Sequence, residues 1–196
     1  MLYLIVILLS MVLISIIDCT IFAHIYNLSV AYVIIAVAVS TIIEILLSGL
    51  VAFIVRWCLP KRWFQINKKF FSATKKEKIF YDKICIKKWK DKIPELGSFT
   101  SFHKDKVREP NNNEYVERYI IEANYGVLIH FISVFVGFAV IFFYPLKFWY
   151  MFGLPVAIVG AILNLLPTFT LRYNLTKLHV LYKFNAKRKS VNDKSS

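Results

Sequence analysis

The chain of 196 residues has few cysteines. The three it has, Cys19, Cys58 and Cys85, are scattered, and no CxxC pair or cysteine/histidine cluster accompanies them. This spacing argues against a structural metal site and against a redox dithiol, so we expect no metal and no cofactor. Cys58 follows an apolar stretch, where acylation is an alternative to a plain interfacial thiol.

Acidic residues are also scarce. The chain has 12 Asp and Glu against 25 Lys and Arg, which gives a net charge of +13, although 58% of its residues are hydrophobic. Charged and apolar residues are segregated along the chain, which is typical of membrane proteins and not of soluble domains. No stretch alternates polar and apolar residues in the manner of a membrane β-barrel, so helices are the expected spans.

Four stretches are almost free of Asp, Glu, Lys, Arg and His. They are 2–17 (none), 29–55 (only Glu44), 127–144 (only His130) and 148–171 (none). A helix needs roughly 20 residues to cross the hydrocarbon core, so the first and third stretches are near the short limit. We predict an all-α, polytopic membrane protein with four transmembrane helices.

These helices divide one predicted membrane domain into four parts. The parts are a first transmembrane hairpin (1–55), a basic segment (56–126), a second transmembrane hairpin (127–171) and a basic tail (172–196).

Basic residues near the span ends predict the orientation. Residues 56–125 hold 17 Lys and Arg, and the tail 172–196 holds seven. The connectors 18–28 and 145–147 hold only Lys147 between them. We therefore predict a multi-pass protein of the cell membrane, with the basic segment and both termini in the cytoplasm.

The basic segment interleaves lysine with aromatic residues. Aromatic rings favour the headgroup layer of a bilayer, and lysine stems extend along apolar surface. We predict an interfacial amphipathic helix over about 73–91, which Pro94 ends. A second helix, capped by Asn113, is expected from Glu114 into the third span. The polar, basic tail 187–196 is expected to be disordered.

The excess of basic charge has two interpretations. One is orientation bias with attraction to anionic lipid, worth about 1 kcal/mol per Lys or Arg near the surface. The other is binding of an anionic substrate. No nucleic-acid-binding motif accompanies the charge, so nucleic acid is not an expected partner.

Glu44 and His130 are candidates for chemistry within the spans. A charge at the bilayer centre costs about 2.5–3.5 kcal/mol on insertion scales, so Glu44 is expected to be protonated or paired. It is either a neutral acid that hydrogen-bonds another helix or a group that handles protons or substrate. Histidine is an effective general base near neutral pH, although a lone interfacial histidine is often merely solvated. Glu122 precedes His130 by eight residues, about 12 Å along a helix, so both could line one site.

Polar residues also end the fourth span. Asn164 precedes Pro167, which removes one helical hydrogen bond. The guanidinium of Arg172 suits a phosphate or a carboxylate, although an arginine at a span end is otherwise an orientation anchor. We expect His130, Glu122, Asn164 and Arg172 to lie near one depth at the inner interface.

Three blocks of the sequence occur in the order and approximate spacing of a known family. They are Lys87-Lys88-Trp89-Lys90-x-Lys92-Ile93-Pro94-Glu95-x-Gly97 with Phe102-x-Lys104, then Ile121-Glu122 with Leu128-Ile129-His130, then Asn164-x-x-Pro167-x4-Arg172-Tyr173-Asn174. Over about half of the chain this pattern resembles the glycosyl-4,4′-diaponeurosporenoate acyltransferases, small bacterial membrane proteins. Four positions depart from the family pattern, namely Tyr125 and Val127 in place of Arg and Glu, and Leu171 and Leu175 in place of Gln and Arg.

The resemblance implies transfer of a fatty acyl group to a hydroxyl of a glycolipid or a glycosylated carotenoid-like lipid. The partners would be a membrane lipid acceptor and an acyl donor, either an acyl thioester carrier or a lipid. In this hypothesis His130 is the general base and Glu122 orients the substrate or the histidine. An oxyanion donor could come from Asn164 or a backbone N–H. The candidate substrate-binding residues are Trp89, Lys90, Glu95, Asn164, Arg172, Tyr173 and Asn174.

Two features bear on the mechanism and on the alternatives. No serine or cysteine nucleophile motif is present, so direct transfer is favoured over a covalent acyl-enzyme. A non-enzymatic membrane interaction or lipid-binding protein is the competing hypothesis, favoured by Tyr125 and Val127. Only Glu44 favours a small transporter or channel.

The predicted orientation can be tested by cysteine accessibility. In a background without the native cysteines, an impermeant thiol reagent applied from outside should label Tyr26→Cys and Leu146→Cys, because the connectors are predicted to be external. It should not label Lys104→Cys or Ser190→Cys in intact cells. The opposite labelling pattern would reject the orientation.

Overall fold

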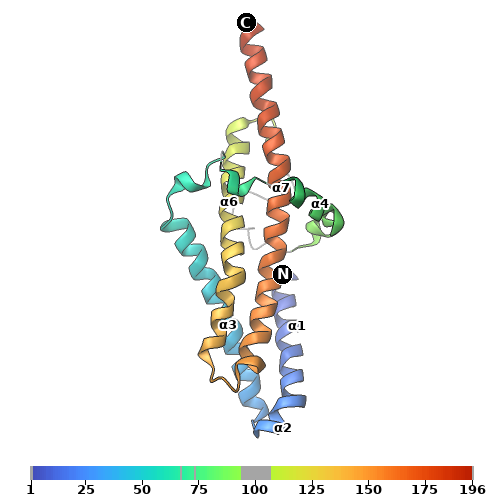
Figure 1. Cartoon of the computed structure of the whole chain (residues 1–196), viewed down its shortest axis with the longest axis vertical. Coiled ribbons are helices and arrows are strands. Elements are labelled where there is room, and N and C mark those ends of the chain that lie inside the picture. Colours follow the sequence, from blue (N-terminus) through green and yellow to red (C-terminus); the bar gives the residue numbers. More distant parts are fainter. Residues whose placement is uncertain (1, 67, 73, 94–106, 196) are drawn as a thin grey trace. The chain divides into compact units, whose positions relative to one another are not determined.

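The computed structural model describes residues 2–66, 68–72, 74–93 and 107–195, and within these ranges the chain is helical without β-strands (Figure 1). Four helices in the described chain are long and apolar enough to cross a membrane. They are Leu4–Tyr26, Val30–Trp57, Asn113–Phe143 and Trp149–Lys189. This confirms the predicted all-α membrane fold with four spans.

The chain divides into two compact units. The apolar unit comprises Met1–Val55 and Ile129–Leu165, and the basic unit comprises Arg56–Leu128 and Leu166–Ser196. Lys147 is the single Lys or Arg in the sequence of the apolar unit. The division by contacts therefore coincides with the segregation of charge along the sequence.

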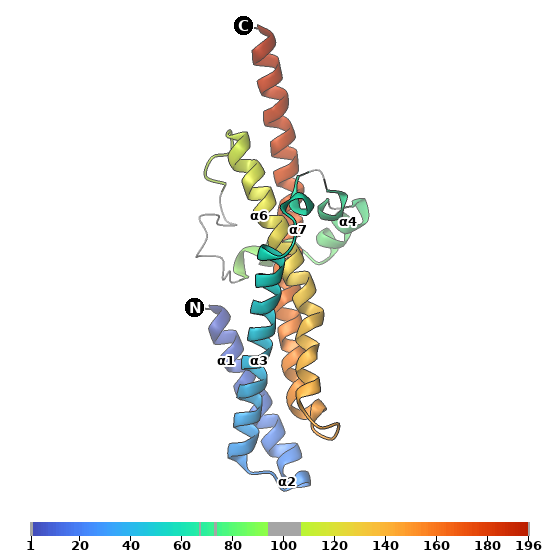
Figure 2. The same cartoon turned by 90° about the vertical axis from the view of Figure 1, so that its left-hand side faces the viewer.

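The apolar unit begins with helix α1 (Leu2–Ile17), a π-helical turn (Asp18–Phe22) and the short helix α2 (Ala23–Tyr26). Asn27 has a φ of 50°, the left-handed conformation in which asparagine often ends a helix. The chain then reverses into α3 (Val30–Trp57), as Figure 2 shows.

The second half of the apolar unit comes from two further helices. Helix α6 (Asn113–Val136) continues as a 3₁₀ helix (Gly137–Phe143), and a π-helical turn (Trp149–Gly153) leads into α7 (Leu154–Ser195). The core joins both hairpins and includes Ile14, Val33, Val37, Met151 and Phe152. Between the hairpins, the Tyr144 hydroxyl donates to the Ala36 carbonyl at 2.9 Å.

Two glycines make room for Glu44 in the apolar unit. A Cβ on Gly160 of α7 would collide with the Glu44 carboxylate, and one on Gly137 would lie 3.4 Å from Glu44 Oε1. Glu44 is 9% exposed, and its Oε1 accepts a hydrogen bond from Ser48 on the same helix at 3.3 Å. The carboxyl group is therefore enclosed by two neighbouring helix backbones.

The basic unit contains shorter elements than the sequence predicts. It has 3₁₀ turns at Lys61–Phe64, Lys69–Phe71 and Lys90–Lys92, and helices α4 (Lys75–Lys83) and α5 (Ile86–Trp89).

The prediction of one helix over 73–91 is wrong, because the helix breaks at Cys85. Cys85 has a φ of 50°. The break lets Ile86 pack fully buried against Tyr81 and Tyr173. The Trp89 indole donates to the Ile84 carbonyl at 2.8 Å, which closes the turn.

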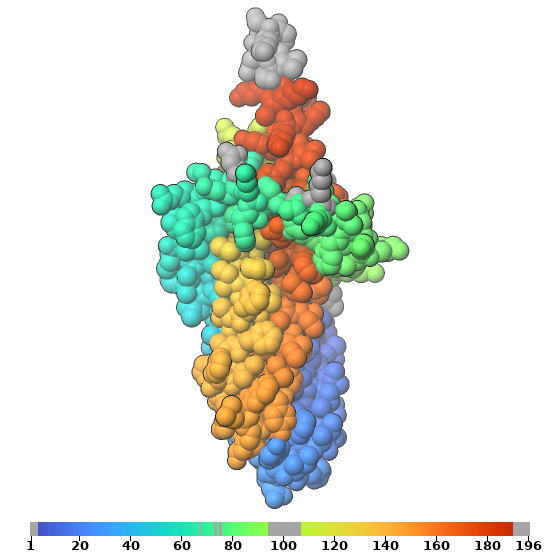
Figure 3. All heavy atoms as spheres, viewed as in Figure 1, coloured from blue at the N-terminus to red at the C-terminus, as the bar shows by residue number. Residues whose placement is uncertain are grey.

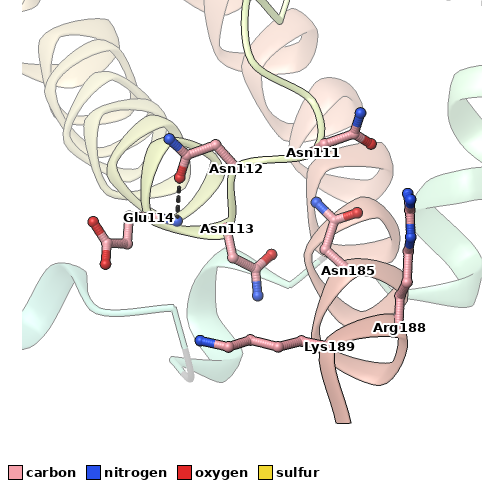
Figure 4. Close-up of a pocket in the computed structure, with 7 residues that line it drawn as sticks. All are labelled: Asn111, Asn112, Asn113, Glu114, Asn185, Arg188 and Lys189. Carbon is pink, nitrogen blue, oxygen red and sulfur yellow. Dashed lines mark hydrogen bonds between the residues drawn. The ribbon is translucent and has the colours of Figure 1, made fainter. Parts of the chain in front are cut away.

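Two predictions about α6 and α7 also need correction. The cap of α6 is Asn112 and not Asn113, because Asn112 Oδ1 accepts from the N–H groups of Glu114 and Tyr115 at 3.1 and 3.2 Å. Figure 4 shows the bond from Glu114. The helix from about residue 114 into the third span is confirmed. The tail is helical to Ser195 and not disordered, because extending an existing helix adds hydrogen bonds without a new nucleus.

The enclosure of Glu44 predicts a specific pair of stability effects. Gly160→Ala should lower the unfolding temperature in detergent, because overpacking typically costs about 1–3 kcal/mol. Glu44→Ala in the same chain should restore most of the loss, because it removes the colliding carboxylate. Gly49→Ala is the matched control, since a Cβ there meets nothing within 4 Å. Equal effects of Gly49→Ala and Gly160→Ala would contradict the packing described.

Candidate functional site

A histidine and an asparagine form the polar centre of the apolar unit. His130 is on α6 and Asn164 is on α7, and His130 Nδ1 lies 3.0 Å from Asn164 Oδ1. Asn164 is 5% exposed, whereas His130 is partly exposed. The second and third sequence blocks therefore meet through these two side chains.

The amide of Asn164 determines which histidine nitrogen carries the proton. Asn164 Nδ2 donates to the Gly160 carbonyl at 3.0 Å, and a carbonyl can only accept. The other end of the amide, Oδ1, is an acceptor and faces the ring. His130 Nδ1 must therefore donate, and in the neutral imidazole the basic lone pair is on Nε2.

The same helix turn links this pair to Glu44. The Gly160 carbonyl accepts the hydrogen bond from the Asn164 amide. Because glycine has no side chain, the Glu44 carboxyl group occupies the space where a Cβ of residue 160 would be. The turn Gly160–Asn164 thus orients the histidine on one side and encloses a carboxyl group on another. Sequence analysis pointed to Glu44 and Asn164 separately but did not identify Gly160.

Glu122, the second predicted catalytic residue, belongs to the basic unit. Its Oε2 accepts from the Arg56 guanidinium at 2.8 Å. Arg56 also lies 5.5 Å above the ring of Tyr125, which stacks on Phe64 with ring centres 3.8 Å apart. Tyr125 and Val127, the two departures from the family pattern in this block, are 7% and 1% exposed. Both residues therefore contribute to packing.

Arg172 joins the third sequence block to α4 within the basic unit. Its Nε donates to Glu77 Oε1 at 2.7 Å, and its NH1 group donates to the Phe70 carbonyl at 3.0 Å. Figure 3 shows the green α4 segment against the orange-red part of α7. Glu77 also forms a capping box with Thr74, accepting from Thr74 N at 2.7 Å and donating its own N–H to Thr74 Oγ1 at 3.2 Å.

Electrostatics favours the charged form of Glu77. Burial raises the pKa of Glu77, but hydrogen bonds from Arg172 and Thr74 and the attraction of the guanidinium outweigh it, so the pKa lies below its ordinary value. Sequence analysis missed Glu77, although the Thr74-x-x-Glu77 pattern is a capping signature that could have identified it.

The other predicted substrate-binding residues are distributed over the basic unit. Tyr173 is buried with Tyr81 and Ile86, and Trp89 packs against this cluster. Lys90 pairs with Asp91. Asn174 is partly buried on α7. Glu95 lies outside the described residues.

A family model described as glycosyl-4,4′-diaponeurosporenoate acyltransferase matches residues 60–183, more than half of the chain, including all three blocks. The chain belongs to this family. No curated protein and no solved structure matches it. Family membership and the four apolar helices identify a membrane protein of acyltransferase type, whose chemistry requires an acyl donor and a lipid acceptor.

The Arg172–Glu77 pair predicts a pH-dependent contribution to stability. Glu77→Gln should lower the free energy of unfolding at neutral pH by about 1.5–3 kcal/mol, the usual scale for hydrogen bonds to charged groups. Because the pKa is lowered on folding, this contribution is present above the ordinary glutamate pKa of about 4.3 and is lost as pH falls through the lowered pKa. Unfolding of both proteins in detergent at several pH values measures the difference.

The matched control is Glu122→Gln. The side chains of Glu122 and Arg56 are 32% and 42% exposed, against 28% and 16% for Glu77 and Arg172. Glu122→Gln should therefore lower the free energy of unfolding by less than Glu77→Gln, because exposed ion pairs contribute little to stability. An equal loss in both variants, or a Glu77→Gln effect that persists at low pH, would contradict this account.

Proposed function

We propose that this protein transfers a fatty acyl group to a hydroxyl of a glycolipid or glycosylated carotenoid-like lipid. The family match supports acyl transfer, and the four spans support a lipid acceptor. The observation that carries the proposal is the His130–Asn164 hydrogen bond, because it leaves the basic lone pair on Nε2 of a partly exposed histidine.

The proposed reaction is a direct transfer. His130 Nε2 removes the proton of the acceptor hydroxyl while the hydroxyl oxygen attacks the carbonyl carbon of the acyl donor. The tetrahedral intermediate collapses, the bond from the carbonyl carbon to the donor breaks, and an ester with the acceptor remains. The histidine then returns its proton to the departing group, so the enzyme ends in its starting state.

Asn164 acts as a positioning residue in this mechanism. Its amide holds Nδ1–H in place, as a carbonyl or carboxylate does for many catalytic histidines. One N–H of Asn164 Nδ2 donates to the Gly160 carbonyl, so the oxyanion donor is either the second N–H of this amide or a backbone N–H.

The remaining site residues have proposed roles near the inner membrane surface. Glu122, held by Arg56, orients the substrate, and Trp89, Lys90, Tyr173 and Asn174 contribute to substrate binding. Arg172 shapes this region through Glu77 and Phe70. We place the protein in the cell membrane with both termini in the cytoplasm, on the basis of the lysine and arginine distribution.

One observation favours a non-enzymatic alternative. Tyr125 and Val127 occupy buried packing positions where the family pattern has Arg and Glu. Packing residues in place of charged residues are expected in a family member that has lost activity but kept its fold. The two functions differ in one measurable outcome, because only the enzyme changes the lipid composition of the membrane.

The decisive experiment compares membrane lipids and pigments by mass spectrometry with and without the gene product. An acylated species that disappears on deletion establishes the reaction and identifies the acceptor. Identical lipid profiles under conditions of good expression would support the non-enzymatic alternative.

His130 should matter for turnover more than for folding. His130→Ala and His130→Gln should insert at normal levels, because the span stays long and apolar, and should lose acylation by a factor of about 10²–10⁴. The measurement is the acylated lipid at matched protein amount. Full activity in both variants would exclude His130 as the base, and loss of the protein itself would assign it a structural role.

Asn164 should affect the rate constant and not the affinity for the acceptor. Asn164→Leu removes the acceptor that fixes the ring, so kcat should fall with little change in KM. Asn164→Asp keeps an acceptor oxygen in place and should retain more activity than Asn164→Leu. Equal activity of the two variants at matched expression would exclude the positioning role.

A further inference from the structure

Two adjoining hollows in the basic unit lie outside the proposed catalytic centre. The first has a volume of about 430 Å³, and its lining includes Ser72, Lys78, His179 and Lys183. The second has a volume of about 380 Å³, and its lining includes Lys78, Asp82, Lys87 and Lys177. Both volumes fall in the range of small-molecule sites, about 300–1,000 Å³.

The two hollows share one boundary. Lys78 of α4 and Thr176 and Val180 of α7 line both of them. Lys78 therefore borders both hollows. A second lysine is available on each side, Lys183 in the first hollow and Lys177 in the second.

The charge of the hollows is strongly positive. Asp82 is the only acid among the described residues that line either hollow, and it lies 3.9 Å from Lys87 in a pair whose side chains are about 70% exposed. Such exposed pairs contribute little. Lys78, Lys177 and Lys183 have no ion pair with any described residue.

The site also has an unsatisfied polar group. His179 Nε2 is buried and has no hydrogen-bond partner among the described residues. Buried polar atoms normally have a partner, which is often a bound water or ion. Arg172, in contrast, is already occupied by Glu77 and the Phe70 carbonyl. Lysines of the hollows are therefore better placed than Arg172 to hold an anionic ligand.

We infer that the two hollows bind the phosphate groups of an acyl thioester of the coenzyme A class. This inference rests on the proposed function, which requires an acyl donor. Such a thioester carries two separate anionic groups, a diphosphate and a 3′-phosphate, and the structure has two adjoining basic hollows. Lysine binds phosphate as a compact point charge. The phosphate of a membrane phospholipid is the other source of the same chemistry, and the experiment separates the two.

The test is calorimetric titration of the full-length protein in detergent with coenzyme A and with dephospho-coenzyme A, which lacks the 3′-phosphate. The wild type should bind coenzyme A more tightly. Lys78→Ala should weaken binding of both ligands by roughly tenfold or more, because a lost charge-assisted hydrogen bond is worth about 1.4 kcal/mol or more. Of Lys177→Ala and Lys183→Ala, one should abolish the preference for the 3′-phosphate.

Two variants control for bulk charge. One is Lys76→Ala, because Lys76 is on α4 but lines neither hollow. The other is Lys189→Ala, because Lys189 lines a separate pocket near the start of α6 (Figure 4). Both controls should bind coenzyme A like the wild type. Wild-type affinity in Lys78→Ala, or equal weakening in all variants, would overturn the inference.

A competition experiment with lipid vesicles tests whether the hollows bind the phosphate of a phospholipid instead of coenzyme A. Phosphatidylglycerol vesicles at the same phosphate concentration should not displace coenzyme A from the wild type. Displacement that disappears in Lys78→Ala would assign the hollows to lipid headgroups and overturn the inference. None of these measurements needs turnover, so absent coenzyme A binding with intact lipid acylation rejects the hollows and leaves the proposed function standing.

Discussion

The hydrogen bond from the Asn164 amide to the Gly160 carbonyl determines the geometry of the polar centre of the apolar unit. It fixes the direction of the amide, and the direction of the amide fixes the tautomer of His130. It also joins the histidine to the glycine beside which Glu44 is enclosed. One turn of α7 thus determines the position of the proton on His130 and the environment of Glu44 near the middle of α3.

The basic unit is organised by a different kind of contact. Glu77 closes the first turn of α4 and receives the Arg172 guanidinium, so one carboxylate serves as helix cap and as ion-pair partner. Because Arg172 already pairs with Glu77, its guanidinium is less available than the lysines to bind an anionic ligand. The lysines of α4 and α7 that line the two hollows, Lys78, Lys177 and Lys183, have no such ion pair with a described residue.

The sequence predicted the features that depend on composition and failed on those that depend on tertiary neighbours. The four spans could be predicted because each corresponds to an apolar stretch with at most one Asp, Glu, Lys, Arg or His. The break at Cys85 could not, because it depends on Ile86 packing with Tyr173, which is far away in sequence. His130 and Asn164 were both identified as candidates, but an asparagine side chain can face in either direction, so its partners had to come from the fold. The glycines around Glu44 have no local signature that distinguishes them from Gly49.

The enclosure of Glu44 also constrains how this protein can evolve. A residue larger than glycine at position 160 collides with the carboxylate while Glu44 is present. If a shorter residue replaces Glu44, position 160 has room for glycine or for a residue with a Cβ. The order of substitutions therefore matters: a lineage that replaces Glu44 first can later replace Gly160, and the reverse order passes through a poorly packed intermediate. Drift at these two positions is accordingly directional, and Gly160 is held in place for as long as the acid is retained.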